Sequence, residues 1–189
     1  MLKDLYIKIS KFSSYVLRHH PEKYGLTLDE KGYANLKRIL NILDNRFQSE
    51  KITLDTLKNM IKESDKKRFE ITNDKIRAYY GHSIDKKIKV NELNEYPEKL
   101  YHGTTQNAYN KIKKKGVKKQ ARQYVHLSRD IETAKNVGKR RTKNPIILQI
   151  DVIRAKNKGI KFYKSGDIFL ADNIPASFIK KLRNGEITQ

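Results

Sequence analysis

The residues best suited to chemistry are arginines and histidines in short motifs, most of which also contain glycine, serine or threonine. They occur at five places along the chain: Arg18-His19-His20-Pro21, Arg77 with Gly81-His82-Ser83, His102-Gly103-Thr104, His126-Leu127-Ser128, and Gly138-Lys139-Arg140. The planar guanidinium group of arginine can bind two oxygens of a phosphate at once. The imidazole of histidine can gain or lose a proton near neutral pH. These are residue types with which proteins hold anions and move protons.

Each motif also has a purely structural interpretation. Arg18 and His19 are expected at the end of a helix, where the helix dipole stabilises a positive charge. His82 follows a glycine and would suit a turn at the exit of a hairpin. His102 and His126 fall on expected strands, where a single histidine is more often a hydrogen-bonded core residue than a catalyst. No motif is specific by itself.

Residues that the chain lacks exclude several kinds of site. It has no cysteine, which rules out disulfides, thiolate nucleophiles, iron–sulfur clusters and cysteine zinc sites. Its nine glycines are scattered singly and form no Rossmann or P-loop fingerprint. A His–Glu helix motif for zinc is missing too, so we expect no metal. The sequence contains neither an apolar run of spanning length nor a signal-peptide core, so we expect a cytoplasmic protein without a membrane partner.

The charge of the chain favours a polyanionic partner. Its 189 residues include 42 Lys and Arg against 21 Asp and Glu, a formal net charge of +21. This surplus indicates nucleic acid first and an anionic membrane second. Residues 1–96 carry 20 basic and 14 acidic groups, whereas residues 97–189 carry 22 basic and 7 acidic groups. The two halves therefore differ in electrostatic character.

The first half predicts three helices followed by a β-hairpin. Apolar residues at three- and four-residue steps indicate three helices: one ending near His20-Pro21, one over residues 36–43, and one capped by Thr53. Two strand-like runs, residues 68–71 and 75–80, flank Thr72-Asn73-Asp74. Asn and Asp tolerate the positive φ of a tight turn. Three helices closed by a hairpin are typical of a winged-helix module, which usually binds nucleic acid.

The second half predicts a mixture of short strands and short helices after a polar linker, Lys86 to Pro97. Strands are expected at residues 100–102, 124–127, 146–150, 161–163 and 168–170. Helices are expected at residues 107–115 and 131–137, with a last one starting at Pro175. Because the elements do not alternate regularly, we interpret this half as a mixed α+β lobe.

Taken together, the motifs resemble those of the RNA 2'-phosphotransferase family of the tRNA 2'-phosphotransferase or KptA type. These NAD-dependent enzymes remove an internal 2'-phosphate from RNA. The most specific blocks are Leu17-Arg18-His19-His20-Pro21-Glu22 and Arg77-Ala78 with Gly81-His82-Ser83. The resemblance covers about residues 9 to 180. The chain departs from it at Tyr80, where the family commonly has Gln, and at Gly166-Asp167.

The resemblance implies an N-terminal winged-helix RNA-binding lobe, residues 1–90. It also implies a C-terminal NAD-binding lobe like that of ADP-ribosyltransferases, residues 97–189, with the reaction in the cleft between them. The RNA 2'-phosphate would attack the nicotinamide ribose and expel nicotinamide, giving an ADP-ribosylated 2'-phosphate. The 2''-hydroxyl would then attack phosphorus, releasing RNA and ADP-ribose 1'',2''-cyclic phosphate. The implied partners are NAD and a 2'-phosphorylated RNA, such as one made in tRNA splicing, bound by a monomer.

The resemblance also assigns roles to residues of this chain. Arg18, His19, Arg77 and Arg140 are implied as catalytic, with His19 donating a proton to the departing RNA oxygen. The residues implied to bind the RNA phosphate are Arg18, Arg77, His82, Ser83 and Arg140. The residues implied to bind NAD are His102, Gly103, Thr104 and Ser128.

Three other functions remain open. A non-enzymatic winged-helix nucleic-acid-binding protein would explain the first half and the charge, but not the motifs of the second half. An ADP-ribosyltransferase that acts on terminal phosphates of nucleic acids would use the same residues. A protein-modifying ADP-ribosyltransferase usually has a catalytic glutamate, and neither Glu132 nor Glu186 stands in a supporting motif.

Overall fold

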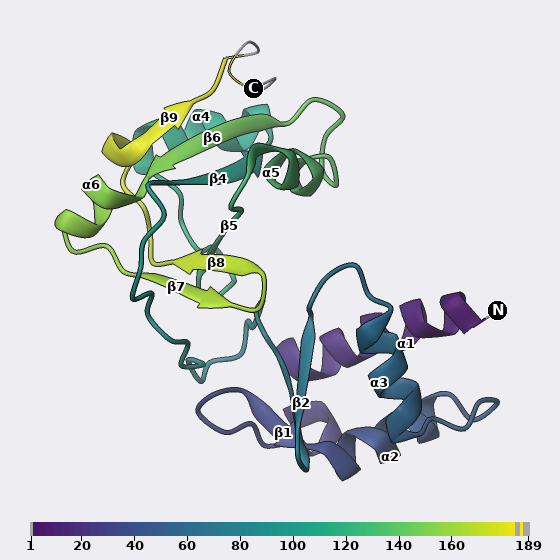
Figure 1. Cartoon of the computed structure of the whole chain (residues 1–189). Coiled ribbons are helices and arrows are strands. Elements are labelled where there is room, and N and C mark those ends of the chain that lie inside the picture. Colours follow the sequence, from purple (N-terminus) through teal and green to yellow (C-terminus); the bar gives the residue numbers. More distant parts are fainter. Residues whose placement is uncertain (1, 184–185, 187–189) are drawn as a thin grey trace. The chain divides into compact units, whose positions relative to one another are not determined.

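The computed structural model describes residues 2–183 and residue 186, and the chain divides into two compact units, residues 1–89 and 90–189 (Figure 1). Each unit has its own hydrophobic core and its own antiparallel sheet or sheets. Helices and strands are mixed, and the paired strands among the described residues are antiparallel. The expected α+β class is therefore confirmed.

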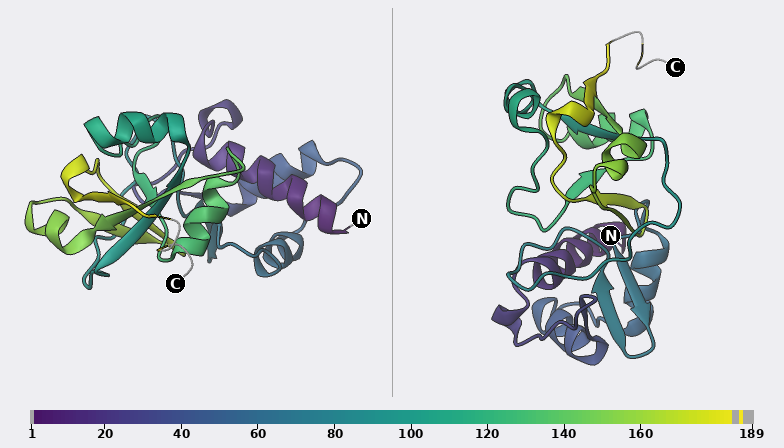
Figure 2. Two further views of the ribbon diagram at one scale, coloured as in Figure 1. Left: turned by 90° about the horizontal axis from the view of Figure 1, so that it is seen from above. Right: turned by 90° about the vertical axis from the view of Figure 1, so that its left-hand side faces the viewer.

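In its described residues the first unit is built from three α-helices, one short 3₁₀ helix and one three-stranded sheet. Its helices are α1 (Leu2–Arg18), the short 3₁₀ helix η1 (Glu22–Tyr24), α2 (Leu36–Arg46) and α3 (Leu54–Lys62). Its strands are β1 (Tyr33–Asn35), β2 (Phe69–Thr72) and β3 (Lys75–Ala78), in the spatial order β1-β3-β2. Helix α1 packs against α2, α3 and β3 (Figure 2).

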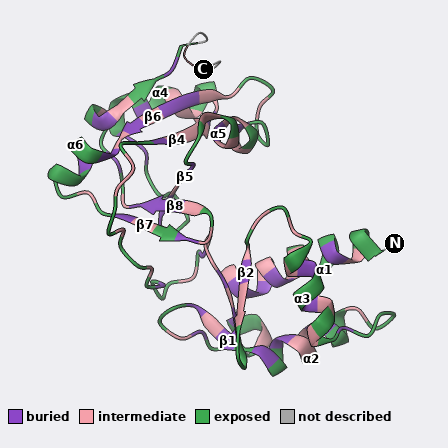
Figure 3. Ribbon diagram, in the orientation of Figure 1, coloured by how far each residue is buried: buried purple, intermediate pink, exposed green. Residues whose placement is uncertain are grey.

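Local sequence explains where these helices begin and end. Helix α1 buries Ile9, Val16 and Leu17 on one face (Figure 3). It ends at Arg18 because a proline follows two residues beyond His19 and disfavours helical backbone before it. The side chain of Asn35 caps α2, and Thr53 caps α3 in a reciprocal capping box.

The hairpin of the first unit is set by its turn. Asn73 has φ +51°, which asparagine tolerates, between β2 and β3. The turn pairs Glu70 with Arg77, and β1 adds to the other edge of β3 so that Tyr33 also lies opposite Arg77. The predicted hairpin is confirmed, while β1 was not anticipated from the sequence.

The described part of the second unit contains two three-stranded antiparallel sheets, three α-helices and one 3₁₀ turn. One sheet has the order β4-β6-β9 and consists of β4 (Lys99–Thr104), β6 (Ile146–Asp151) and β9 (Ile179–Lys181). The other has the order β5-β8-β7 and consists of β5 (Val125–Leu127), β8 (Ile168–Ala171) and β7 (Phe162–Ser165). The helices are α4 (Gln106–Lys115), α5 (Ile131–Gly138), α6 (Val152–Asn157) and the 3₁₀ turn η2 (Ala176–Phe178).

Packing joins the two sheets of the second unit around one core. Phe162, Leu148 and Ile150 are fully buried in that core. Backbone hydrogen bonds in both directions between Tyr101 and Ser128 tie β4 to the end of β5. Helix α5 packs on β4 and β6 (Figure 1). The arrangement brings the middle of β4 close to the residue after β5.

One expectation about the second half is wrong in detail. The helix expected from Pro175 is only the single turn η2, because the chain then extends as β9 and Ile179 pairs with Ile150 in the sheet. The segment expected as a linker contains the boundary between the two units, which falls between residues 89 and 90, and each of its ends packs on one unit. Ile88 is buried in the first core, and Leu93 donates a backbone hydrogen bond to Phe162 within the second unit.

No helix in the part of the chain that the structure describes is both long and apolar enough to cross a membrane.

Candidate functional site

Arg18 is enclosed by aromatic rings and by the backbone that precedes His82. Its guanidinium carbon lies 4.9 Å from the ring centre of Tyr80 and 5.9 Å from that of Phe69. A Cβ atom on Gly81 would come within 3.4 Å of the Arg18 side chain, and Gly81 has φ +92°. Glycine therefore suits this position both for its backbone and for the space that Arg18 fills. The cation–π contacts hold the guanidinium at a defined place beside the hairpin exit.

His19 and Ser83 join the end of α1 to the Gly81-His82-Ser83 segment. The Nδ1 atom of His19 lies 2.8 Å from the Ser83 hydroxyl oxygen. The backbone N–H of Ser83 donates to the carbonyl oxygen of Arg18 at 3.0 Å. The two motifs lie 64 residues apart in sequence, yet they form one structure in the first unit.

His82 is the buried member of this group. It is 4% exposed, and burial, reinforced by the charge of Arg18, lowers its pKa to about 4. Within the described residues its Nε2 atom has no hydrogen-bond partner, and a Cβ on Gly32 would lie 3.4 Å from that atom. His82 is therefore neutral at neutral pH. It could offer an anion an N–H group but not a charge.

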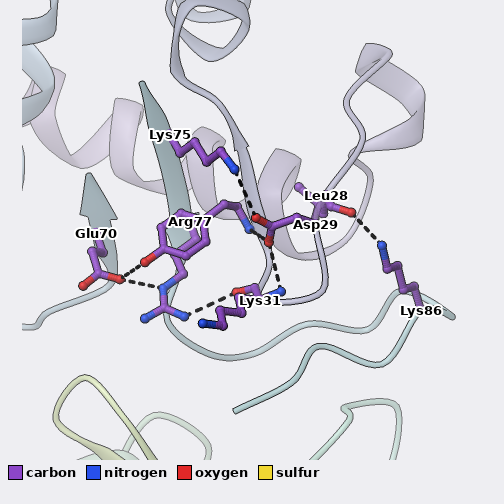
Figure 4. Close-up of polar contacts among 8 residues, drawn as sticks. Leu28, Asp29, Lys31, Glu70, Lys75, Arg77 and Lys86 are labelled. Carbon is purple, nitrogen blue, oxygen red and sulfur yellow. Dashed lines mark hydrogen bonds and ion pairs between the residues drawn. The ribbon is translucent and has the colours of Figure 1, made fainter. Parts of the chain in front are cut away.

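Arg77 is held by residues of its own sheet and by the loop before β1. Its Nε–H donates to Oε2 of Glu70 at 2.7 Å, and the Tyr33 hydroxyl donates to the same oxygen at 2.6 Å. Its guanidinium carbon lies 4.6 Å from the ring centre of Tyr33 and 5.3 Å from that of Tyr79. Figure 4 shows the guanidinium between the Glu70 carboxylate and the carbonyl oxygen of Lys31, which accepts from Nη1 at 3.4 Å.

A tight loop places that carbonyl group. One carboxylate oxygen of Asp29 accepts from the backbone N–H groups of Lys31 and Tyr33, each at 2.9 Å. The other oxygen lies 3.6 Å from the ammonium group of Lys75 (Figure 4). Burial would raise the pKa of Asp29, but the two backbone donors and Lys75 lower it below its ordinary value. Lys86 closes the loop with a 2.9 Å hydrogen bond to the carbonyl oxygen of Leu28.

In the second unit, His102 points its ring nitrogen at the backbone of the neighbouring strand. Its Nδ1 atom lies 3.0 Å from the carbonyl oxygen of His126. Because a carbonyl oxygen only accepts, Nδ1 carries the hydrogen and Nε2 of the neutral ring is an acceptor. Burial lowers the pKa of His102, although the His126 carbonyl works in the opposite direction. The ring is thus fixed in one tautomer.

Gly103 has a packing reason to be glycine. A Cβ atom there would lie 1.9 Å from the carbonyl oxygen of Ala134 on α5. Helix α5 therefore rests directly on the β4 backbone. Thr104, which ends β4, is buried, and so is Ser128, which the Tyr101 hydrogen bonds hold beside the same strand. The four residues implied to bind NAD thus belong to one small region of the second unit.

Arg140 lies just after α5, the helix that packs on Gly103. Its backbone N–H donates to Val137, and its side chain is exposed. The structure therefore distributes the implied site between the two units: Arg18, His19, Arg77, His82 and Ser83 belong to the first, and Arg140 belongs to the second with His102, Gly103, Thr104 and Ser128.

Two residues of this site, Glu70 and Tyr33, were not identified from the sequence. The signal for Glu70 was available, because a turn centred on Asn73-Asp74 places residue 70 opposite residue 77. Tyr33 had no comparable signal, since β1 is only three residues long. No group of three or more His, Asp or Glu residues among those described could hold a metal ion.

Comparisons with known proteins match most of the chain. The model of the RNA 2'-phosphotransferase, Tpt1 / KptA family matches residues 4–171. A "Probable RNA 2'-phosphotransferase" of Acetivibrio thermocellus is 47% identical over 176 residues, covering 93% of this chain and 96% of the relative. One of Bacillus thuringiensis subsp. konkukian is 46% identical over 183 residues, covering 96% and 98%. "Probable RNA 2'-phosphotransferase 1" of Archaeoglobus fulgidus is 40% identical over 181 residues, covering 95% and 82%.

Proposed function

The chain belongs to the RNA 2'-phosphotransferase, Tpt1 / KptA family, and from this premise we propose that it removes an internal 2'-phosphate from RNA with NAD as co-substrate. The observation that carries the proposal is the joining of Arg18, His19 and Ser83 into one structure. Arg77 lies close enough to contribute, like Arg18, to the lowered pKa of His82. Two arginines and a histidine gathered at one place suit a phosphate that must be held while it reacts.

The first unit is proposed as an RNA-binding unit of the winged-helix type. Its three helices and its antiparallel sheet, in which β1 pairs with the β2-β3 hairpin, support that assignment. The second unit is proposed as an NAD-binding unit of the ADP-ribosyltransferase type. Its two small antiparallel sheets and the grouping of the implied NAD residues support it.

The residues near β4 fit the co-substrate by their chemistry. The fixed tautomer of His102 offers an acceptor nitrogen, and Thr104 and Ser128 offer hydroxyl groups. NAD would supply a ribose carbon from which nicotinamide departs. His102, Thr104 and Ser128 would hold the nucleotide beside β4.

The chain's own contribution is to hold and neutralise the RNA phosphate. A 2'-phosphate is already an anionic nucleophile, so its attack on the ribose carbon needs orientation rather than a strong base. The bond from that carbon to nicotinamide breaks, and the electron pair leaves with nicotinamide. Arg18, Arg77 and Arg140 would supply the cations that keep the phosphate in line.

In the second step the 2''-hydroxyl oxygen forms a bond to phosphorus, and the bond from phosphorus to the RNA 2'-oxygen breaks. Charge grows on the non-bridging oxygens, where arginine donors stabilise it. The attacking hydroxyl loses its proton to solvent, and the departing RNA oxygen gains one. His19 would deliver that proton, because an imidazole changes its charge near neutral pH.

A product analysis tests this function. The protein is incubated with an oligonucleotide that carries one internal 2'-phosphate, with and without NAD. We expect RNA with a free 2'-hydroxyl, nicotinamide and ADP-ribose 1'',2''-cyclic phosphate, and only when NAD is present. Release of inorganic phosphate without NAD would contradict the proposal. ADP-ribose transferred only to terminal phosphates would instead identify the related activity.

A further inference from the structure

Glu70 and Tyr33 converge on Arg77 from the two strands beside it. All three residues are in register across the sheet, so their side chains lie on the same face. The carboxylate oxygen Oε2 of Glu70 accepts from both partners, at 2.7 Å from Arg77 and 2.6 Å from Tyr33. The Arg77 and Glu70 side chains are only 20% and 29% exposed. We propose that Glu70 and Tyr33 are positioning residues that aim the Arg77 guanidinium at the RNA 2'-phosphate.

The geometry leaves the far edge of the guanidinium for an anion. Arginine has five N–H donors. Glu70 takes the Nε–H, and the carbonyl of Lys31 takes one hydrogen of Nη1. Both hydrogens of Nη2 have no acceptor among the residues that the structure describes. The Tyr33 ring packs against the guanidinium and restricts its rotation, so the unused edge keeps one direction.

A carboxylate beside a phosphate site weakens phosphate binding, because like charges repel, so its presence needs a compensating benefit. Two donors and the Arg77 charge keep Glu70 ionised, and its pKa lies below the ordinary value although burial would raise it. A fixed guanidinium loses less conformational freedom when it binds, and misplacing a catalytic group by about 1 Å can cost ~10²-fold in rate. The increase in rate from a correctly oriented Arg77 can therefore exceed the cost of repulsion between Glu70 and the phosphate.

The assignment rests on the proposed function, so the test uses the 2'-phosphorylated oligonucleotide with NAD and the full chain. Glu70→Ala is expected to lower kcat about 10²-fold, with the KM for NAD and the Tm little changed. Glu70→Gln keeps an acceptor for Nε and is expected to recover about tenfold of that loss. Tyr33→Phe keeps the ring and is expected to lower kcat about 3- to 10-fold, as for one lost hydrogen bond.

A double-mutant cycle separates positioning from general stabilisation of the sheet. In the Arg77→Ala background, removal of Glu70 should change kcat by less than about twofold, because there is no guanidinium left to aim. Glu30 forms an exposed ion pair with Lys89 in the same unit, and Glu30→Ala is the matched control with wild-type kcat.

The assignment would be overturned if Glu70→Gln and Tyr33→Phe both kept the wild-type kcat. It would also be overturned if removal of Glu70 lowered kcat in the Arg77→Ala background as much as it does in the wild type. A fall in kcat for Glu30→Ala as large as that for Glu70→Ala would be a third contradiction. If Glu70→Ala does not fold, the other two single variants decide. An inactive wild-type protein would instead refute the proposed function.

A separate observation concerns the charge of the second unit. Residues 99–129 carry nine basic residues and no acidic one, whereas the rest of residues 90–189 carry thirteen basic and nine acidic residues. Helix α4 lies in this stretch and bears Lys111, Lys113, Lys114 and Lys115. None of the four forms an ion pair with a described residue, and Lys111 and Lys115 are placed to repel each other along the helix. Repulsion among these lysines lowers the stability of α4.

We infer that this face of α4 binds the phosphodiester backbone of the RNA substrate away from the 2'-phosphate. A hollow on the helix surface is lined by Asn107, Asn110, Lys111, Lys114 and Lys115. Ammonium and amide groups are the usual partners of nucleic-acid phosphates and sugars. A membrane-bound helix would instead need an outward apolar face, and Ile112, the buried residue of α4, faces inward.

Substrate length tests this surface, which again presupposes the proposed function. The variant Lys111→Gln/Lys114→Gln/Lys115→Gln is compared with Lys143→Gln/Lys156→Gln/Lys158→Gln, which removes the same charge elsewhere in the unit. For a substrate of about 30 nucleotides, the first variant is expected to raise KM about tenfold. Its plot of log kcat/KM against log salt should be shallower by about 2. For a 2'-phosphorylated trinucleotide, both variants should match the wild type.

Equal effects on the long and short substrates would overturn this surface, and so would an equal effect of the control variant. Loss of binding to anionic lipid vesicles without any change for the long RNA would assign the helix to a membrane instead. A wild-type protein that processes neither RNA would refute the proposed function.

Discussion

His82 couples the stability of the first unit to pH. Its pKa is about 4 in the folded protein, from burial and then from Arg18, against an ordinary value near 6.5. The unfolded chain therefore binds more protons between these values. The contribution of neutral His82 to the free energy of unfolding is fully present above about pH 6.5 and is lost as the pH falls through about 4.

We expect the free energy of unfolding to fall by up to about 3 kcal/mol across this interval because of His82. Denaturant unfolding at several pH values, with His82→Gln as the comparison, measures it. The variant lacks this titration, so its stability should depend less steeply on pH. Equal slopes for the two proteins would show that His82 is not buried in its neutral form.

His102 allows a second test at the scale of one residue. Its replacement should affect stability if it is only a core histidine and NAD affinity if it contacts NAD. The ring is held by the His126 carbonyl, and its other nitrogen is the acceptor. We expect His102→Ala to weaken NAD binding about 3- to 10-fold, as for a lost hydrogen bond of ~0.5–1.5 kcal/mol. Calorimetric titration with NAD measures this. A large fall in Tm with unchanged NAD affinity of the folded protein would assign His102 to the core alone.

At the residue scale, the sequence identified the arginines and histidines of the candidate site but not which neighbours they contact. Arg18 and Arg77 were identified because the motifs that contain them resemble, taken together, those of a known family. The ring of Tyr80 over Arg18 and the Glu70–Tyr33 pair over Arg77 depend on contacts across strands. Such contacts follow only once the register is known, and the register of β1 is fixed by tertiary packing.

At the scale of elements, the contact between α5 and β4 is the most sensitive to a small change. A methyl group at Gly103 would overlap the carbonyl oxygen of Ala134 at 1.9 Å. We expect Gly103→Ala to lower the free energy of unfolding by about 1–3 kcal/mol, as for other overpacked sites.

Thermal unfolding measures the Gly103 effect, and Gly159→Ala is the control. Gly159 has φ +84° but no atom within 4 Å of an added Cβ, so its variant reports backbone strain without a clash. A Gly103→Ala protein as stable as the wild type would show that α5 can move away from β4 without cost.

Most elements follow from the sequence, and the exceptions share a cause. The β2-β3 hairpin was predictable because Asn73 marks its turn. Helix α6 was not, since Val152 and Ile153 at its start favour a strand by propensity, and only the cap by Asp151 indicates a helix. Strand β9 replaces an expected helix because an open edge of β6 is available to Ile179. These two exceptions, of six and three residues, are decided by their neighbours.

At the scale of the whole molecule, the chain carries its implied phosphate and nucleotide residues on two separately packed units. Each unit buries its own apolar residues, for example Leu57 in the first and Leu100 in the second. The change in charge along the sequence indicated two different roles, but it could not show which side chains meet. The proposed reaction needs Arg77 from one unit and Arg140 from the other to act on the same phosphate.

That requirement predicts how the two chemical steps separate. Attack on the ribose carbon depends mainly on nicotinamide as a leaving group, whereas the second step must stabilise new charge around phosphorus. Losing one charge-stabilising donor typically costs ~10²–10³ in rate. Arg77→Ala and Arg140→Ala should therefore slow the second step more than the first, and 2'-phospho-ADP-ribosylated RNA should accumulate as a retarded band on a gel of labelled RNA. His102→Ala, which is expected to weaken NAD binding, should give slower turnover without that band. If both arginine variants stopped before any ADP-ribosylated RNA formed, the arginines would serve to bind and orient the phosphate for the first step.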